Sequence, residues 1–230
     1  MITKIRKKIL SIVHPLLKAI ANSYLSKTRT FTHNNITVKV FPGVFHPGLF
    51  FSTKLLIEFM GRQNIRDKRV LELGAGSGLL SLFCAKQGAQ VTASDINPTA
   101  IKGIESNAKL NQLSLKVVLS DLFEHLSIHE FDIILINPPY YPRNPEKLED
   151  RAWFCGEDFN YFKNLFSSLG KETREDGPIT YMILSEDCAI ETILNLAKEN
   201  GLASDLIFRK KVKMENNFIY KISHNVRDAG

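Results

Sequence analysis

The apolar residues of this chain change their spacing at about Leu49. Residues 4 to 26 carry apolar side chains at close to a helical period, with lysines between them. This pattern predicts an amphipathic helix that Pro15 kinks or divides. Residues 36 to 40 alternate apolar and polar positions and predict a strand. Beyond Leu49, short apolar runs alternate with segments of helical period, which is typical of a parallel sheet covered by helices on both faces.

The alternating part of the chain predicts strands and helices in turn. Strands are expected over residues 69–73, 91–95, 115–119, 131–136 and 179–184, and helices over 77–87, 98–110, 158–169 and 188–199. The runs at 115–119 and 131–136 read as buried strands. Residues 205–208 and 218–223 are expected to form a terminal antiparallel pair. The sequence therefore predicts an α/β fold with one doubly wound, mostly parallel, seven-stranded Rossmann-like sheet over residues 41–230, preceded by a basic helical extension over residues 1–40.

Composition is that of a folded globular protein, with 44% hydrophobic and 23% charged residues among 230. The net charge of +6 is unevenly placed. Residues 1–57 hold nine Lys or Arg and no Asp or Glu, whereas the remainder carries a balance of −3. Such a basic front commonly contacts nucleic acid, a ribosome or an acidic partner. A solvated amphipathic helix without a partner explains the same charges, and both readings stay open.

Cysteine usage and hydropathy bear on the cell compartment. The three cysteines, Cys84, Cys155 and Cys188, are an odd number without a CxxC pair, which indicates reduced thiols and a cytoplasmic protein rather than a disulfide framework or a zinc site. No apolar run approaches the roughly 20 residues that span a bilayer. No His, Asp and Glu cluster has metal-ligand spacing, so we expect no metal.

A glycine-rich turn between an expected strand and helix is the first chemical signal. It contains Glu72, Gly74, Ala75, Gly76 and Gly78. Glycines let the backbone turn sharply and approach a ligand without a Cβ in the way. A dinucleotide-binding loop has the spacing G-x-G-x-x-G, but here it is G-x-G-x-G after an acid. An acidic strand end repels phosphate and suits a ligand with a cationic amino-acid end.

Acids end the next two expected strands. Asp95 lies about 20 residues beyond the glycines, where a carboxylate can bind a ribose diol, and Ile96 beside it can cover an adenine. Asp121 follows the third strand, where its carboxylate or the Leu122 amide can meet the adenine edge. A helix cap is an equal reading of Asp121.

The most specific signal is the tetrapeptide Asn137-Pro138-Pro139-Tyr140 directly after an apolar strand. Ligands of open α/β sheets bind beyond the carboxyl ends of strands, so this loop is expected at the site. The Asn137 side-chain oxygen and the Pro138 carbonyl can each accept a hydrogen from one NH₂ group. Tyr140 can stack on the planar group that carries it.

Together these residues resemble the class I S-adenosylmethionine methyltransferases, specifically the small-domain group with an N-P-P-Y loop. That group includes HemK-type glutamine methyltransferases of release factors and enzymes acting on adenine N6 or guanine N2. The resemblance covers about residues 40 to 200 and implies S-adenosylmethionine as cofactor and a planar nitrogen as acceptor. It implies that Glu72, the glycine loop, Asp95, Ile96, Asp121 and Leu122 bind the cofactor, and that Asn137 to Tyr140 are catalytic.

Two further stretches are similar to segments of the same group. The segment from Val44 to Thr53 resembles the one that folds over the methionine end of the cofactor, which implies that His46, Phe50 and Thr53 lie near the sulfonium. A loop or core histidine is the alternative for His46. Ala152-Trp-Phe-Cys-Gly156 looks like the A-W-x-G-G segment of HemK-related glutamine methyltransferases, with Cys155 where that pattern has glycine. Plain packing of Trp153 is an equal reading.

The expected reaction is an in-line transfer of a methyl group from sulfonium to nitrogen, aided by fixed hydrogen-bond acceptors and positioning. A protein glutamine, such as one in a translation factor, is slightly favoured as acceptor by the segment at residues 152–156. An RNA base, adenine N6 in particular, is favoured by the basic front and by the Tyr140-Tyr141 pair. A non-catalytic module that binds RNA or a partner on the same fold is the third hypothesis.

Overall fold

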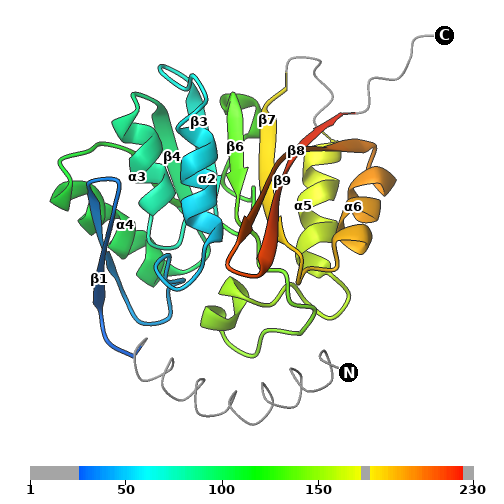
Figure 1. Cartoon of the computed structure of the whole chain (residues 1–230), viewed down its shortest axis with the longest axis horizontal. Coiled ribbons are helices and arrows are strands. Elements are labelled where there is room, and N and C mark those ends of the chain that lie inside the picture. The colour runs from blue at the N-terminus through cyan, green and yellow to red at the C-terminus, as the bar shows by residue number, and fades with distance from the viewer. Residues whose placement is uncertain (1–25, 172–176, 225–230) are drawn as a thin grey trace.

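The computed structural model of the chain describes residues 26–171 and 177–224. Figure 1 shows a central sheet with helices on both of its faces. The strands are β1 (Arg29–His33), β2 (Ile36–Val40), β3 (Arg69–Leu73), β4 (Gln90–Asp95), β5 (Lys116–Leu119), β6 (Ile133–Ile136), β7 (Ile179–Ser185), β8 (Leu202–Val212) and β9 (Glu215–His224). The helices are α2 (Ser52–Met60), α3 (Leu79–Lys86), α4 (Pro98–Leu110), α5 (Asn160–Gly170) and α6 (Ile190–Glu199), with short 3-10 helices η1 (Ile128–Glu130) and η2 (Leu148–Ala152).

Within the described residues, seven strands form one sheet in the order β5-β4-β3-β6-β7-β9-β8. Strands β3 to β7 pair in parallel, whereas β9 runs antiparallel to β7 and β8 antiparallel to β9. The predicted doubly wound sheet and its terminal antiparallel pair are therefore confirmed. The chain winds outward from β3 in one direction and from β6 in the other, which opens a crevice at the carboxyl ends of these two neighbouring strands.

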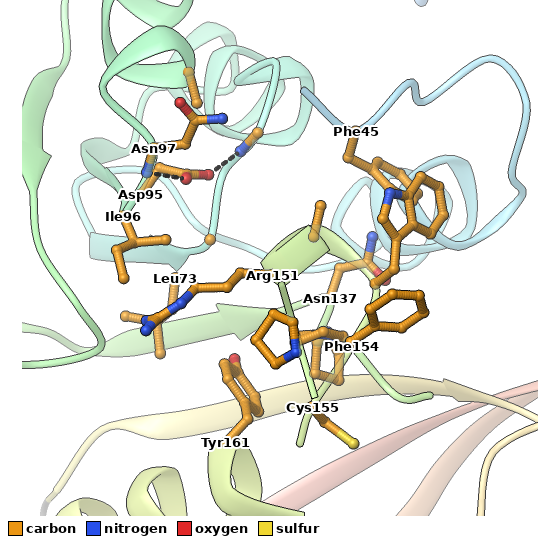
Figure 2. Close-up of a pocket in the computed structure, with 18 of the residues that line it drawn as sticks. Phe45, Leu73, Asp95, Ile96, Asn97, Asn137, Arg151, Phe154, Cys155 and Tyr161 are labelled. Carbon is orange, nitrogen blue, oxygen red and sulfur yellow. Dashed lines mark hydrogen bonds between the residues drawn. The ribbon is translucent and has the colours of Figure 1, made fainter. Parts of the chain in front are cut away.

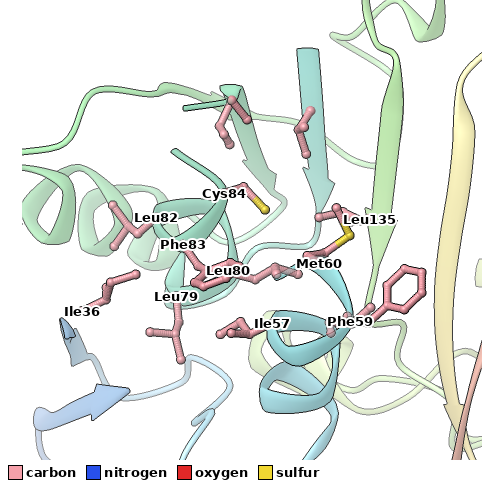
Figure 3. Close-up of a cluster of buried hydrophobic side chains, with 14 of the residues drawn as sticks. Ile36, Ile57, Phe59, Met60, Leu79, Leu80, Leu82, Phe83, Cys84 and Leu135 are labelled. Carbon is pink, nitrogen blue, oxygen red and sulfur yellow. The ribbon is translucent and has the colours of Figure 1, made fainter. Parts of the chain in front are cut away.

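Two hydrophobic cores hold the helices against the two faces of the sheet. On one face, α2, α3 and the β1–β2 hairpin pack together, and Figure 3 shows side chains of α2 and α3 meeting Leu135 of β6. Helix α3 is apolar around most of its circumference because neighbours surround it on several sides. On the other face, α5 buries Phe162, Leu165 and Phe166 beneath β6 and β7.

A β-hairpin precedes the sheet, and side chains of α4 hold its second strand. Strands β1 and β2 pair antiparallel, and the β1 strand was not among the predicted elements. The Asn107 side chain accepts from the Lys39 backbone N–H (2.8 Å) and donates to the Lys39 carbonyl (3.0 Å). Asn111 makes the same two bonds to the backbone of Thr37. Two amides thus replace a neighbouring strand and satisfy the backbone groups of β2.

The predicted helix over residues 4 to 26 and most of the basic front lie outside the described residues. The division of the chain at residue 40 stays a prediction, although Val38 and Val40 belong to the core of the following domain. The prediction that residues 115–119 are buried is wrong. Strand β5 is partly exposed because it forms one edge of the sheet, and Leu119 keeps 48% of its surface accessible. None of the helices in the two described ranges is long and apolar enough to cross a membrane.

Candidate functional site

A cavity of about 400 Å³ lies at the carboxyl ends of the parallel strands. Its walls come from the loops after β3, β4, β5 and β6, from the segment before α2, from η2 and from the start of α5 (Figure 2). Of the residues that the sequence predicted for the site, Gly78, His46 and Phe50 do not line this cavity, and the others do. Those that line it are Thr53, Glu72, Gly74, Ala75, Gly76, Asp95, Ile96, Asp121, Leu122, Asn137, Pro138, Pro139 and Tyr140.

The glycine loop needs its glycines for two different reasons. Gly74, Gly76 and Gly78 have φ of 74°, 54° and 75°, a region that residues with a Cβ rarely adopt. A Cβ on Gly74 would have no neighbour within 4 Å and would project into open space. A Cβ on Gly78 would come within 3.1 Å of the Ile104 side chain. Gly74 therefore leaves room for a ligand, whereas Gly78 allows α3 to begin close against α4.

Glu72 lies buried at the end of β3 and is held by the first turns of α3. Its Oε2 atom accepts from the Ser81 backbone N–H (2.7 Å) and from the Ser81 hydroxyl. Burial raises the pKa of the Glu72 carboxyl to about 8. The Oε1 atom has no hydrogen-bond partner among the described residues, and Glu72 lines the cavity. This oxygen is therefore available to a cationic ligand group, which would favour the ionised form.

The raised pKa of Glu72 predicts how stability depends on pH. The folded, cofactor-free protein keeps this proton up to about pH 8, whereas the unfolded chain releases it near 4.5. Because the folded state binds more protons in this window, the contribution of Glu72 to stability falls as pH rises from about 4.5 to about 8. We expect Glu72→Gln to gain stability relative to the wild type at high pH. Urea unfolding of both proteins at pH 5.5 and 8.5 measures this, and a difference that is the same at both pH values contradicts it.

Asp95 ends β4 with both carboxylate oxygens bound to backbone. Oδ2 accepts from the Gly76 N–H and Oδ1 from the Asn97 N–H, each at 2.8 Å (dashed lines in Figure 2). Burial raises the pKa of Asp95, and these backbone donors oppose the rise. A carboxylate oxygen can accept more than one hydrogen, so acceptor capacity remains for a diol. Asp95 also ties the glycine loop to the start of α4, and Ile96 beside it lines the cavity.

Asp121 meets a partner from the other side of the cavity. Its Oδ2 atom lies 3.0 Å from Nη1 of Arg151 in η2, and both side chains are about half exposed. Turns follow Asp121 within the described residues 122–127, so the reading of Asp121 as a helix cap is wrong. The ion pair joins the loop after β5 to the segment that follows the N-P-P-Y loop. Figure 2 shows the Arg151 side chain among the residues that line the cavity.

We expect Arg151→Gln and Asp121→Asn each to weaken S-adenosylmethionine binding by about threefold, with little change in stability, because an exposed ion pair contributes roughly 0–1 kcal/mol. The two changes combined should weaken binding by less than the product of the two single losses, since both remove the same ion pair. Calorimetric titration of the four proteins measures the coupling. Strictly additive losses of binding free energy would show that the ion pair does not hold the loop after β5 and η2 in position.

The N-P-P-Y loop leaves β6 at the centre of the crevice. The Asn137 side chain makes no hydrogen bond to any of the described residues, and it lines the cavity with both prolines. The Tyr140 ring packs on the Tyr141 ring, with centroids 4.7 Å apart and an angle of 54° between the ring planes. Tyr140 also packs against the hydrophobic core beneath α5. Burial raises the pKa of the Tyr140 hydroxyl, which therefore stays protonated. The amide of Asn137 is free to bind a ligand, while Tyr140 forms a supported wall.

Three aromatic rings close the cavity near Asn137. The Phe45, Phe50 and Trp153 ring centroids lie 4.8–5.1 Å apart, and Phe45 and Trp153 line the cavity. Phe50 packs behind them. His46 lies elsewhere: it is 3% exposed, its Nδ1 accepts from the Gly48 N–H (3.1 Å), and it does not line the cavity. The alternative reading of His46 as a loop histidine is therefore the one the structure favours.

Several residues of the cavity were not predicted from the sequence. Phe45 was not itself singled out although it lies in the segment from Val44 to Thr53, and Arg151 and Tyr161 belong to segments without a motif of their own. Tertiary packing brings all three to the wall. Burial raises the pKa of Tyr161, and the charges of Asp121 and Asp95 raise it further. A neutral hydroxyl therefore faces the part of the cavity where both carboxylates lie. The one sequence feature that marks Tyr161 is its place at the start of the helix after the N-P-P-Y loop.

No group of three or more His, Cys, Asp or Glu side chains in the described part of the chain could hold a metal ion. All three cysteines are free thiols in the interior. Burial raises the pKa of Cys155 to about 11, so it stays a neutral thiol near Tyr141, whose carbonyl it contacts. Carboxylates, amides, backbone groups and aromatic rings line the cavity.

Comparison with known proteins decides the class. The family model of the methyltransferase small domain matches residues 35–152. The chain belongs to this family. A relative from Methanocaldococcus jannaschii, named "Putative protein N5-glutamine methyltransferase", is 32% identical over 185 residues, which cover 78% of this chain and 91% of the relative.

Two solved structures share the fold of this methyltransferase. The E. cuniculi Mtq2-Trm112 complex, responsible for methylation of the translation termination factor eRF1, has a TM-score of 0.61 at 18% identity, over 80% of this chain and 99% of that one. The T. thermophilus 16S rRNA N2 G1207 methyltransferase, in complex with AdoMet and guanosine, has a TM-score of 0.61 at 22% identity, over 85% of this chain and 50% of that one. The predicted S-adenosylmethionine-dependent N-methyltransferase class, with its Rossmann-like fold, is thus confirmed.

Proposed function

We propose that this methyltransferase transfers a methyl group to the side-chain amide nitrogen of a protein glutamine. The observation that carries the proposal is the Asn137 amide, which lies at the carboxyl end of β6 without a hydrogen bond to the described residues. An amide side chain is complementary to another amide, because each offers a carbonyl acceptor and N–H donors. The name of the M. jannaschii relative, which matches over most of both chains, supports the same acceptor.

The cavity fits the cofactor by three observations. Open space above Gly74, where a Cβ would project, leaves room for a ligand against the backbone. The Glu72 Oε1 atom can bind an ammonium, and the Asp95 carboxylate can bind a ribose diol beside the Ile96 side chain. Thr53 and the glycine loop would enclose the methionine part between them. When bound, S-adenosylmethionine supplies a methyl group on a positively charged sulfur, which makes that methyl electrophilic.

The N-P-P-Y loop would prepare the nitrogen for attack. An amide nitrogen is a poor nucleophile because its lone pair is delocalised into the carbonyl. The Asn137 side-chain oxygen and the Pro138 carbonyl would each accept one N–H of the acceptor, which turns the lone pair toward the methyl group. These acceptors are fixed before the reaction, so they stabilise the transition state without reorganisation. The nitrogen loses one proton to solvent after the new N–C bond forms.

The aromatic wall limits what can enter beside Asn137. Phe45 and Trp153 pack on each other and on Phe50, so their rings are braced and cannot move apart without losing contacts. A glutamine side chain is slim and flexible and can pass such a wall with its backbone outside. Buried free thiols suit a reducing cytoplasm as the place of this reaction.

Tritiated S-adenosylmethionine and the purified protein, added to a lysate of cells that lack this chain, test the proposal. Half of the product is treated with RNase and half with protease before precipitation. Purified translation termination factors serve as defined protein acceptors in parallel. We expect the label to survive RNase, to be lost with protease, and to appear in N5-methylglutamine after enzymatic digestion and mass spectrometry.

Other outcomes overturn the proposal in different ways. Label lost with RNase would make this chain an RNA base methyltransferase, the class of the T. thermophilus neighbour. Label in protein but in another amino acid would keep the protein acceptor and exclude glutamine. No label in either half, with intact cofactor binding, would favour a binding module.

A further inference from the structure

Two lysines from distant parts of the chain converge on one aromatic ring. The Lys54 Nζ atom lies 5.1 Å from the centroid of the Phe51 ring, and the Lys213 Nζ atom lies 5.2 Å from it. Lys54 belongs to the first turn of α2, whereas Lys213 lies in the turn between β8 and β9. Figure 1 shows this hairpin turn beside α2, on the side of the sheet where the carboxyl ends of the parallel strands lie. The pair thus concentrates positive charge at one point of the surface.

No carboxylate among the described residues pairs with either lysine. Glu58, one turn along α2 from Lys54, binds Arg62 (2.8 Å) and Lys210 (2.6 Å) instead. The Lys54 ammonium donates to the Gly48 carbonyl (3.3 Å) and gains no negative charge from it. The first turn of α2 holds no acidic residue, and a cation is disfavoured at a helix N-terminus. This arrangement costs stability, which a bound anion would offset.

The positive charge of the two lysines lowers the pKa of neighbouring groups. Burial lowers the pKa of Lys54, and the charge of Lys213 lowers it further. Burial and then the charge of Lys54 lower the pKa of His33 in β1. Each of these groups would be easier to protonate if an anion were close. The lysines therefore repel further positive charge and attract negative charge at the same place.

Lys54 and Lys213 lie next to the part of the cavity that is proposed to hold the methyl acceptor. Phe50 and Phe51 are consecutive, and their rings contact different neighbours. The Phe50 ring lies 4.8 Å from Trp153, which lines the cavity, whereas the Phe51 ring faces the two lysines. A segment whose glutamine enters beside Trp153 would therefore pass over the lysines with its adjoining residues.

We propose that Lys54 and Lys213 dock an acidic segment of the protein acceptor, next in sequence to the glutamine that is methylated. The nature of the acceptor rests on the proposed function. Among the described residues that line the cavity, the cationic side chain is Arg151, which binds Asp121; Arg143, outside the lining, lies 3.6 Å from Glu146 and over the Phe154 ring. On the adjoining strand β8, Lys210 binds Glu58 and Arg209 lies over the Phe218 ring. An RNA strand would need cations along its whole backbone, whereas two converging lysines are enough for a short acidic peptide segment.

Equilibrium binding of labelled peptides tests the docking site without requiring turnover. Two fluorescent 15-residue peptides carry one central glutamine, followed by four aspartates in one and four asparagines in the other. Fluorescence anisotropy at low salt measures their affinities for the full chain and for Lys213→Glu, Lys54→Gln/Lys213→Glu and Lys116→Glu. Lys213 is in a hairpin turn and outside the core, so its replacement leaves the fold intact. Lys116 on β5, at the other edge of the sheet, gives the control with the same change of charge.

We expect the wild type and Lys116→Glu to bind the aspartate peptide about tenfold more tightly than the asparagine peptide, and Lys213→Glu to lose most of this preference. Equal binding of both peptides by the wild type, or an equal loss in Lys116→Glu, overturns the proposal. A ten-nucleotide oligouridylate is tested in the same way. If Lys213→Glu weakens binding of this RNA and leaves binding of the aspartate peptide unchanged, the proposal is also overturned. The peptide experiment measures binding and no methyl transfer. Its failure can therefore be distinguished from a failure of the proposed function, which the labelling experiment tests.

Discussion

Replacement of Asn137 with alanine is expected to reduce methyl transfer by about 100-fold or more, which is the typical cost of losing one fixed hydrogen-bonding group at a reacting centre. The Asn137 amide makes no hydrogen bond to the described residues, so its removal breaks no internal contact of the fold. Affinity for S-adenosylmethionine should stay within about twofold, because the residues assigned to the cofactor lie on α2, β3, β4 and the loops after β3, β4 and β5, and none lies on the N-P-P-Y loop. The loss should therefore appear in kcat.

Single-turnover rates and calorimetric titration of the same preparation separate these two effects. Asn195→Ala provides the matched control, since Asn195 is exposed on α6 and does not line the cavity. If Asn137→Ala transferred methyl groups at the rate of the control, the assigned role of the N-P-P-Y loop would be wrong. If it lost cofactor affinity instead, Asn137 would belong to the cofactor site.

Replacement of Asp95 with alanine is expected to weaken S-adenosylmethionine binding by about 100-fold, because hydrogen bonds to a charged group contribute roughly 1.5–3 kcal/mol. The change removes the predicted contact with the ribose diol. It also frees the N–H groups of Gly76 and Asn97, which the Asp95 carboxylate now binds. The glycine loop would lose its tie to the start of α4.

Asp95→Asn separates these two contributions. Its amide keeps one oxygen acceptor and about the same shape, so it should hold one of the two backbone N–H groups and lose the second acceptor oxygen. We expect an affinity between those of the wild type and Asp95→Ala. Thermal unfolding of all three proteins controls for loss of fold. An unchanged calorimetric affinity of Asp95→Ala would refute the ribose assignment.

Local sequence was enough to predict the parallel strands and most of the helices. Residues 69–73 are strand β3 as expected, and the helix expected over 98–110 has the bounds of α4, where Asn97 caps the first turn and Pro98 follows. Gly201, directly after the C-cap residue of α6, has a φ of 75°, which is usual for a glycine in the C′ position. These signals are local, because a turn or a cap is decided by a few neighbouring residues.

What the sequence did not predict depends on contacts between distant segments. Burial of β5 was misjudged because a strand's neighbours follow from the strand order, and the order places β5 at an edge. The β1 strand was missed because its Arg-Thr-Phe-Thr-His sequence has one apolar residue. Phe45 reaches the cavity from the irregular segment before α2 and Arg151 from the short 3-10 helix η2, and packing sets the position of both. The glycine, Asp95 and N-P-P-Y positions were predictable because strand ends carry them to one place.

Both edges of the sheet are built in ways that discourage pairing with another chain. At one edge, β5 is four residues long and offers few backbone groups. At the other edge, β8 has eleven residues, but its register with β9 shifts between Leu206 and Phe208, and Arg209, Lys210 and Lys211 follow. An irregular register and a run of like charges oppose the approach of a second strand. The protein can thus keep a long open sheet and the exposed Leu206 while resisting edge-to-edge aggregation.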